Sequence, residues 1–466
     1  MKDPIIDSNE NIERYSNGNN EYQSKENNEC RSNGDLGHLR GLGISEKAAM
    51  LLMERNAMKR GTERIRNALG SLGKPQDEFP IIMVGGTNGK TSTVHYLSQL
   101  LGHIGYKVGS FTSPNPDNIL KDIQVWNRGL DAGKGKGTHI PPQEFSWYIE
   151  EESDSAYELT SFELEVVSAL LYFREQKIDV AVMEMGMGGE GDAVFTREPD
   201  LAVITNVSVE HKRHLGDTLK EIARNKAAII PKHGTIITST TPPALTIIES
   251  VAREKGADLI IPNNEEYLPH LFHLMVDYHK KNASLAMEAA LRFVFHCDPD
   301  RSSKVSTIAL IHLAQKLTPP EGRLQVIDLE DSIKLILDGA HNPAGFEVLF
   351  PEIRKKMITS GRRRIVVILG ILDDKDHAKM VDITRTLPGI YICVAPPTPR
   401  ALDPHTLVKN IKQYHPENYV APSVGDALET AQLLLRDEGG LILLTGSLYM
   451  VAESQRYLSK MENMEK

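Results

Sequence analysis

Short apolar runs alternate with amphipathic stretches along most of the chain. Between residues 81 and 240, the apolar runs have the composition of buried strands, and the stretches between them repeat apolar residues at helical spacing. The expected strands are 81–84, 107–111, 179–185, 201–207 and 234–240, and the expected helices are 92–104, 142–152, 161–175 and 218–229. Buried strands separated by helices predict a parallel sheet that is covered on both faces.

The chain before the first strand has a different pattern. Residues 1–35 are rich in Asn, Ser and Glu and have too few apolar side chains to offset the entropy of ordering, so we expect a disordered polar tail. The tail lacks the apolar core of a secretory signal. From about 44 to 72, apolar residues recur at helical spacing, which predicts one or two amphipathic helices.

A second α/β pattern begins after a break at TPPEGR, residues 318–323. Apolar runs such as IKLILDG, RRIVVILGI, IYICVAP and GGLILLTG follow, with helices expected around 346–357 and after 377. We therefore expect a domain with N-terminal helices over 36–318 and a smaller α/β domain over 319–466, joined by a hinge near 319–323.

Composition narrows the class of protein. A chain of 466 residues has room for two or three domains, and its hydrophobic (40%) and charged (25%) fractions are those of a globular protein. A net charge of −10 argues against non-specific binding to nucleic acid, and no apolar run approaches the ~18 residues that cross a bilayer. Three widely spaced cysteines suit a reducing compartment. We expect a cytoplasmic monomer that acts on small molecules, with neither nucleic acid nor membrane as a partner.

The sequence GGTNGKTS, residues 85–92, joins an expected strand to an expected helix. In this arrangement backbone N–H groups and a helix N-terminus hold phosphate, a lysine adds a point charge, and a hydroxyl can bind Mg²⁺. The usual spacing would need glycine at Val84, so the loop is a shorter variant. The alternative is a plain glycine-rich turn. The expected phosphate-binding residues are Gly86, Thr87, Asn88, Gly89, Lys90, Thr91 and Ser92.

This short loop resembles that of the Mur ligase superfamily, and residues 45–455 resemble folylpolyglutamate synthase and dihydrofolate synthase. The segments that carry the resemblance include VGGTNGKTST, KVGSFTSP, TSFELEVVSALLYF, DVAVMEMGMGGEGDA, HLGDTLKEIARNKAAII, PPEGRLQVI, LILDGAHNPAG, LGILDDKD and LLTGSLY. The resemblance implies a three-layer αβα ATP-binding domain of the P-loop type, followed by a smaller, Rossmann-like α/β domain.

The resemblance also implies an activity. Ligases of this family use ATP to convert a carboxylate to an acyl phosphate, which an amine attacks to give an amide, ADP and phosphate. The implied cofactors are ATP and Mg²⁺, with room for a second Mg²⁺ and a monovalent cation, and the implied amine is glutamate. Aromatic and apolar side chains would line a pterin pocket, for which Phe111, Phe162 and Trp126 are candidates.

The family's metal ligands match Ser113, Glu184 and His211 of this chain, and Thr91 of the phosphate loop is a further candidate. Lys226 matches a lysine that is carbamylated in the family, so the implied catalytic residues are Lys90, Glu184, His211 and Lys226. Two alternatives stay open at these positions: His211 as an ordinary loop residue, and Lys226 as a helix lysine that points to water.

Four further residues match the nucleotide site of the family. Asn282 resembles an asparagine that borders the adenine, and Arg323 resembles a hinge arginine that reaches the phosphates. Asp338 and His341 resemble residues that close the site from the second domain, with a structural cap as the alternative for His341.

Three stretches depart from the folate-using members of the family. SPNPDN stands where SPHL is usual, ILKDIQVWN where the usual phrase ends in ERIRING, and Glu190 of GGEGDAVF where arginine is usual. The resemblance still makes glutamate ligation to a folate or dihydropteroate-like acid the leading hypothesis, but these departures leave the identity of the acid open. The same chemistry on another acid, such as a tetrapyrrole precursor or a muramyl peptide, stays open, as does an ATP-binding regulatory or scaffold protein.

Overall fold

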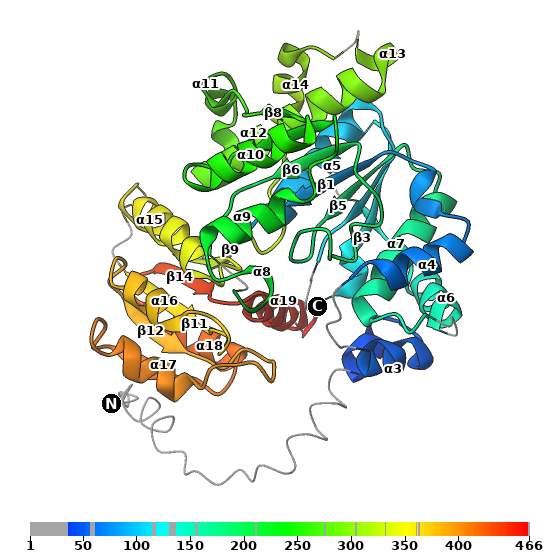
Figure 1. Cartoon of the computed structure of the whole chain (residues 1–466). Coiled ribbons are helices and arrows are strands. Elements are labelled where there is room, and N and C mark those ends of the chain that lie inside the picture. Colours follow the sequence, from blue (N-terminus) through cyan, green and yellow to red (C-terminus); the bar gives the residue numbers. More distant parts are fainter. Residues whose placement is uncertain are drawn as a thin grey trace, which may run out of the picture. The chain divides into compact units, whose positions relative to one another are not determined.

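The computed structural model of the chain divides into two compact units between Pro320 and Glu321 (Figure 1). The described residues are 36–55, 61–113, 118–129, 137–153, 157–209, 212–274, 276–302, 305–330, 332–359, 361 and 364–464. The predicted tail, residues 1–35, lies outside them. None of the described helices combines the length and the apolar composition that crossing a membrane requires.

The described part of the first unit contains an eight-stranded sheet with the order β4-β3-β2-β5-β1-β6-β7-β8. The strands are β1 (Ile81–Gly85), β2 (Val108–Phe111), β3 (Ile123–Trp126), β4 (Thr138–His139), β5 (Val180–Glu184), β6 (Leu201–Ile204), β7 (Thr235–Thr238) and β8 (Asp258–Ile260). The six strands from β2 to β8 in this order are parallel, as predicted, whereas β3 and β4 add an antiparallel edge. Every residue of the central strand β1 is buried, which explains its unbroken apolar run.

Helices cover both faces of this sheet (Figure 1). One face packs against α3 (Glu46–Glu54), α4 (Glu63–Ser71), α6 (Pro142–Ser153), α7 (Ser161–Glu175), α9 (Leu219–Ala227) and α10 (Ala244–Lys255). The other face packs against α5 (Lys90–Ile104), α12 (Asp277–Cys297) and α14 (Thr307–Ala314). The short helices are η1 (Pro75–Asp77), η2 (Ile119–Asp122), α8 (Lys212–Leu215), α11 (Asn264–Tyr267), η3 (Leu268–His270), η4 (Phe272–Leu274) and α13 (Pro299–Ser302).

Two helices of this unit begin with a reciprocal cap that is visible in the sequence. The side chain of Thr160 accepts from the backbone of Glu163 at the start of α7, and the Glu163 carboxylate accepts from the Thr160 backbone. Thr218 and Glu221 form the same pair at the start of α9. Such a cap stabilises a helix by about 1 kcal/mol. It fixes where α9 begins, and therefore where its last turn places Lys226.

The second unit contains a six-stranded sheet with the order β13-β12-β11-β14-β10-β9 in its described residues. The strands are β9 (Gln325–Glu330), β10 (Ile333–Leu337), β11 (Ile365–Leu369), β12 (Ile390–Cys393), β13 (Asn418–Val420) and β14 (Gly440–Thr445). All pairs are parallel except the edge pair of β9 and β10. The helices are α15 (Pro343–Thr359), α16 (His377–Thr384), α17 (Pro404–Ile411), α18 (Val424–Leu435) and α19 (Leu448–Met464), of which α18 and α19 share a core with the sheet. Both units are thus α/β, as predicted.

Candidate active site

The predicted phosphate loop joins the central strand β1 to helix α5. Two of its glycines have backbone conformations that other residues rarely adopt, with φ of 134° at Gly86 and 86° at Gly89. Space is also restricted: a Cβ at Gly86 would lie 2.0 Å from Oγ1 of Thr205, and one at Gly89 would lie 2.5 Å from Oδ1 of Asn282. Both positions therefore require glycine, for shape as well as for backbone freedom.

Lys90 is the first residue of α5, so its ammonium and the free N–H groups of the helix start lie at the same place. Its Nζ donates to the Thr87 carbonyl at 3.2 Å, across the loop. Thr91 and Ser92 follow within the first turn. A lysine folded over its own glycine-rich loop, beside helix N–H groups, is an arrangement that binds phosphate.

A polar segment that follows β6 contacts the same loop. Oγ1 of Thr205 and Nδ2 of Asn206 both donate to the Asn88 carbonyl at 2.7 Å. The sequence analysis did not single out Thr205 or Asn206, because these contacts join residues more than a hundred positions apart. The sequence shows only that polar residues follow an apolar run, whereas the pairing of this run with β1 appears in the fold.

Glu184 is the last residue of β5, next to β1 in the sheet, and its side chain is only 2% exposed. Oγ1 of Thr91 donates to its Oε1 at 3.2 Å. The structure thus brings together two of the predicted metal ligands, a carboxylate at the end of β5 and a hydroxyl in the first turn of α5. Oxygen donors of this kind suit Mg²⁺, so the residues present fit the implied ion.

The other two predicted metal ligands are less completely described. Ser113 follows the end of β2, the neighbour of β5, and is half-buried at the same edge of the sheet. His211 lies outside the described residues. Both assignments stay predictions.

Lys226 is buried, with an exposed fraction of 1%, so the alternative of a lysine that points to water is wrong. Its Nζ donates to the carbonyl of Gly86 at 2.8 Å and to that of Met187 at 3.2 Å. It therefore connects the phosphate loop to the loop that follows Glu184.

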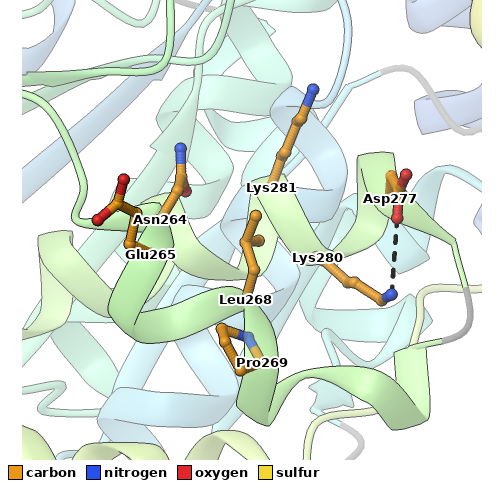
Figure 2. A pocket seen from close by; sticks show the side chains of 7 residues that line it. All are labelled: Asn264, Glu265, Leu268, Pro269, Asp277, Lys280 and Lys281. Carbon is orange, nitrogen blue, oxygen red and sulfur yellow. Dashed lines mark ion pairs between the residues drawn. The ribbon is translucent and has the colours of Figure 1, made fainter.

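Asn282 lies in the second turn of α12, beside Gly89 of the phosphate loop. A hollow of about 390 Å³ opens near the start of this helix (Figure 2). Its lining residues come from α11, η3 and α12 and are Asn264, Glu265, Leu268, Pro269, Asp277, Lys280 and Lys281. Its volume is within the range of small-molecule pockets, about 300–1,000 Å³.

Arg323, Asp338 and His341 belong to the second unit and lie close to one another there. Asp338 follows β10 and is 5% exposed; its two carboxylate oxygens accept from the backbone N–H groups of Leu324 and Ala340, each at 2.9 Å. A Cβ at Gly339 would lie 2.5 Å from Nη1 of Arg323. The ring Nδ1 of His341 is 2.9 Å from the Gly339 carbonyl oxygen. Asp338 therefore ties the predicted hinge sequence to the turn that carries His341.

The predicted aromatic pocket residues separate into two groups. Phe111 is buried and Phe162 half-buried, with ring centroids 6.0 Å apart, and the Phe162 ring lies against Gly186, two residues after Glu184. Trp126 is buried in the core on the opposite face of the sheet, so it does not share a pocket with them, which corrects that part of the prediction. One turn after Phe162, burial raises the pKa of the Glu165 carboxyl to about 8.

Comparison with known proteins places this geometry in a family. The model of the Mur ligase middle domain matches residues 84–281, and that of the Mur ligase glutamate ligase domain matches residues 322–448. A dihydrofolate synthase/folylpolyglutamate synthase of Bacillus subtilis is 29% identical over 429 residues, which cover 86% of this chain and 95% of that protein. The chain belongs to the folylpolyglutamate and dihydrofolate synthase family of Mur ligases. The predicted family is thereby confirmed.

Two further members of the family show how far the likeness extends. A probable bifunctional folylpolyglutamate synthase/dihydropteroate synthase of Haloferax volcanii is 30% identical over 429 residues, 86% of this chain, but the chain spans only 49% of that protein. The structure of Escherichia coli FolC in complex with DHPP and ADP aligns with a TM-score of 0.72 at 25% identity, over 92% of this chain and 98% of that one. This alignment confirms the predicted α/β fold of two domains.

Proposed function

We propose that the protein is an ATP-dependent ligase that couples L-glutamate to a folate or dihydropteroate-like acid. The observation that carries the proposal is the juxtaposition of Lys90 and the phosphate loop with the buried Glu184 carboxylate, at the ends of adjacent parallel strands. Family membership supports it, since the Bacillus subtilis relative carries the same pair of activities in its name. Family membership also favours an enzyme over an ATP-binding scaffold protein.

The reaction needs charge neutralisation and alignment more than a protein nucleophile. A carboxylate oxygen of the acid attacks the γ-phosphorus of ATP, which forms an acyl phosphate and releases ADP. The amine of glutamate then attacks the acyl carbon, the C–N bond forms, and phosphate leaves with the oxygen that the acid supplied. Mg²⁺ would offset negative charge on the phosphates and the acid, held by Thr91 and Glu184, with Ser113 and His211 as further predicted ligands.

Each remaining side chain has a role in this proposal. Lys90 and the N–H groups at the start of α5 bind the phosphates. Asn282, beside Gly89, would border the base, and the hollow of Figure 2 lies near the start of the same helix. Phe162, which is half-buried and packs against the buried Phe111, stays the predicted contact of the acid. Arg323, Asp338 and His341 of the C-terminal ligase domain, residues 319–466, stay predicted nucleotide ligands on the family resemblance.

Which carboxylic acid the ligase uses is a more specific question than the type of reaction. Glu190 stands where the resemblance implies arginine, and its carboxylate is 3.9 Å from Nζ of Lys255. Its side chain is 66% exposed, so a substrate can approach it. This observation keeps a different acid as the second candidate. Cytoplasmic location, the monomeric state, the second Mg²⁺ and the monovalent cation stay predictions.

The substrate is tested by a phosphate-release screen of purified protein with MgATP. Dihydropteroate, folates, muramyl peptides and tetrapyrrole acids are each combined with glutamate, other amino acids and ammonia. We expect release that requires both a pterin acid and glutamate, with the amide product found by mass spectrometry. Release with a different acid would support the second candidate, and release with no acid and amine pair would refute the ligase.

If Lys226 is carbamylated, the activity should depend on bicarbonate. A neutral buried amine that has added carbon dioxide gains a carboxylate, which can help position the metal. Activity should then fall in bicarbonate-depleted buffer and return when bicarbonate is added, and Lys226→Ala should be inactive in both buffers. An active Lys226→Ala whose turnover ignores bicarbonate would remove the carbamate from the proposal.

A further inference from the structure

The segment of residues 205–208, which follows β6, is hydrogen-bonded along the phosphate loop. The Thr87 N–H donates to the Asn206 carbonyl at 2.9 Å, and the Ser208 N–H donates to Oγ1 of Thr87 at 3.0 Å. The Thr205 N–H donates to the Gly85 carbonyl at 3.0 Å, which continues the pairing of β6 with β1. Residues 205–208 therefore form a template for the phosphate loop, because their hydrogen bonds run along it.

The side chain of Asn206 has the most specific contact in this segment. Its Oδ1 accepts from the Asn88 N–H at 3.1 Å, and its Nδ2 donates to the Asn88 carbonyl at 2.7 Å. The carboxamide thus satisfies both backbone polar groups of one loop residue, as a neighbouring strand would. Thr205 adds a second donor to the Asn88 carbonyl, also at 2.7 Å. A carboxamide suits this position at neutral pH, because it offers a donor and an acceptor side by side, whereas an ionised carboxylate offers acceptors only.

The pairing has a consequence for phosphate binding. Because the Asn88 N–H is directed to Asn206, it does not serve as a donor to the nucleotide. The start of α5 supplies other donors, because Lys90, Thr91 and Ser92 are the first helical residues and their N–H groups have no partner within the helix. Asn88 contributes to the site through the shape of the loop.

We propose that Asn206 is a positioning residue for nucleotide binding, which holds the phosphate loop in its binding conformation before the nucleotide arrives. The proposal rests on the proposed function, since it assumes that the loop binds the phosphates of ATP. Asn206 touches neither the acid nor the amine in this account. Its loss should therefore weaken nucleotide binding and leave the KM of the acid unchanged.

The sharpest variant is Asn206→Asp, which keeps the shape but replaces the donor with a second acceptor. At pH 8 the carboxylate faces the Asn88 carbonyl oxygen and adds a negative charge beside the phosphate site. We expect the Kd of MgADP, measured by calorimetry, and the KM of ATP to rise by at least about tenfold. This is the effect expected when the hydrogen bond to the Asn88 carbonyl is lost and a charged acceptor takes the place of the donor. Asn418→Asp is the matched control, because Nδ2 of Asn418 donates to the His415 carbonyl in the other unit. It should leave both constants unchanged.

The pH dependence separates this role from a general structural one. Once protonated, the carboxyl group introduced by Asn206→Asp can donate to the Asn88 carbonyl again. The MgADP affinity of this variant relative to wild type should therefore recover as the pH is lowered towards 5. If Asn206→Asp binds MgADP as tightly as wild type at pH 8, the inference is wrong. If the wild-type protein itself binds no MgADP, the proposed function is wrong, so the two failures are distinguishable.

A measurement on the wild-type protein covers the outcome in which the variant does not fold. Hydrogen exchange of the peptide over residues 84–92 should show the Asn88 amide protected before any nucleotide is added, with little further protection after MgADP. An Asn88 amide that exchanges freely until MgADP binds would overturn the inference, because the loop would then be ordered by the ligand.

Discussion

Lys90→Ala should lower ATP-dependent phosphate release by about a hundredfold to a thousandfold, the usual cost of removing a preorganised group that stabilises developing charge. Lys90 Nζ lies over the loop and donates to the Thr87 carbonyl, a contact that it can exchange for a phosphate oxygen. No other residue named for the phosphate loop carries a positive charge. Lys226, which also contacts the loop, donates to the carbonyls of Gly86 and Met187.

The measurement is steady-state phosphate release with saturating acid and glutamate, together with the Kd of MgADP. Lys220→Ala is a suitable control, because Lys220 is an exposed lysine of α9 and has no assigned role. It should retain wild-type turnover. Turnover of Lys90→Ala above a tenth of wild type would count strongly against this phosphate site.

Glu184→Gln should raise the Mg²⁺ concentration needed for half-maximal activity by more than about tenfold and lower kcat. The substitution keeps the shape of the side chain and its contact with Thr91 but removes the negative charge, and a hard divalent cation binds a carboxylate far better than an amide. The site is buried, so bulk solvent does not replace the lost charge.

Glu288→Gln provides the control for a buried carboxylate as such. Glu288 is 4% exposed in the same unit, and its oxygens accept from Tyr267 and Arg292. Its substitution should lower the melting temperature without shifting the Mg²⁺ titration. A Glu184→Gln protein with a wild-type Mg²⁺ titration would exclude Glu184 from the metal site.

The sequence predicted the parts of the fold that depend on local patterns. The unbroken apolar run of β1 and the helical spacing over 161–175 and 218–229 are local, and the structure has β1, α7 and α9 there. The antiparallel edge strands β3, β4 and β9 were not predicted, because short edge strands lack a distinctive period and their direction depends on how the chain returns to the sheet.

The candidate site divides in the same way. The phosphate loop is a continuous motif, so its position between β1 and α5 and its need for glycines could be predicted from the sequence. The burial of Lys226 could not be inferred from the helical pattern of α9, because its partner Gly86 is 140 residues away in sequence. The template of residues 205–208 was missed for the same reason: its function appears only when β6 lies beside β1.

The central claim is that ATP activates a carboxylate for attack by an amine. Its most direct test uses an acid whose carboxylate carries a heavy oxygen isotope, incubated with MgATP and glutamate. The account predicts that the released inorganic phosphate contains one labelled oxygen for each amide formed, because the oxygen that attacks the γ-phosphorus leaves with it. Unlabelled phosphate from a reaction that forms the amide would contradict the account.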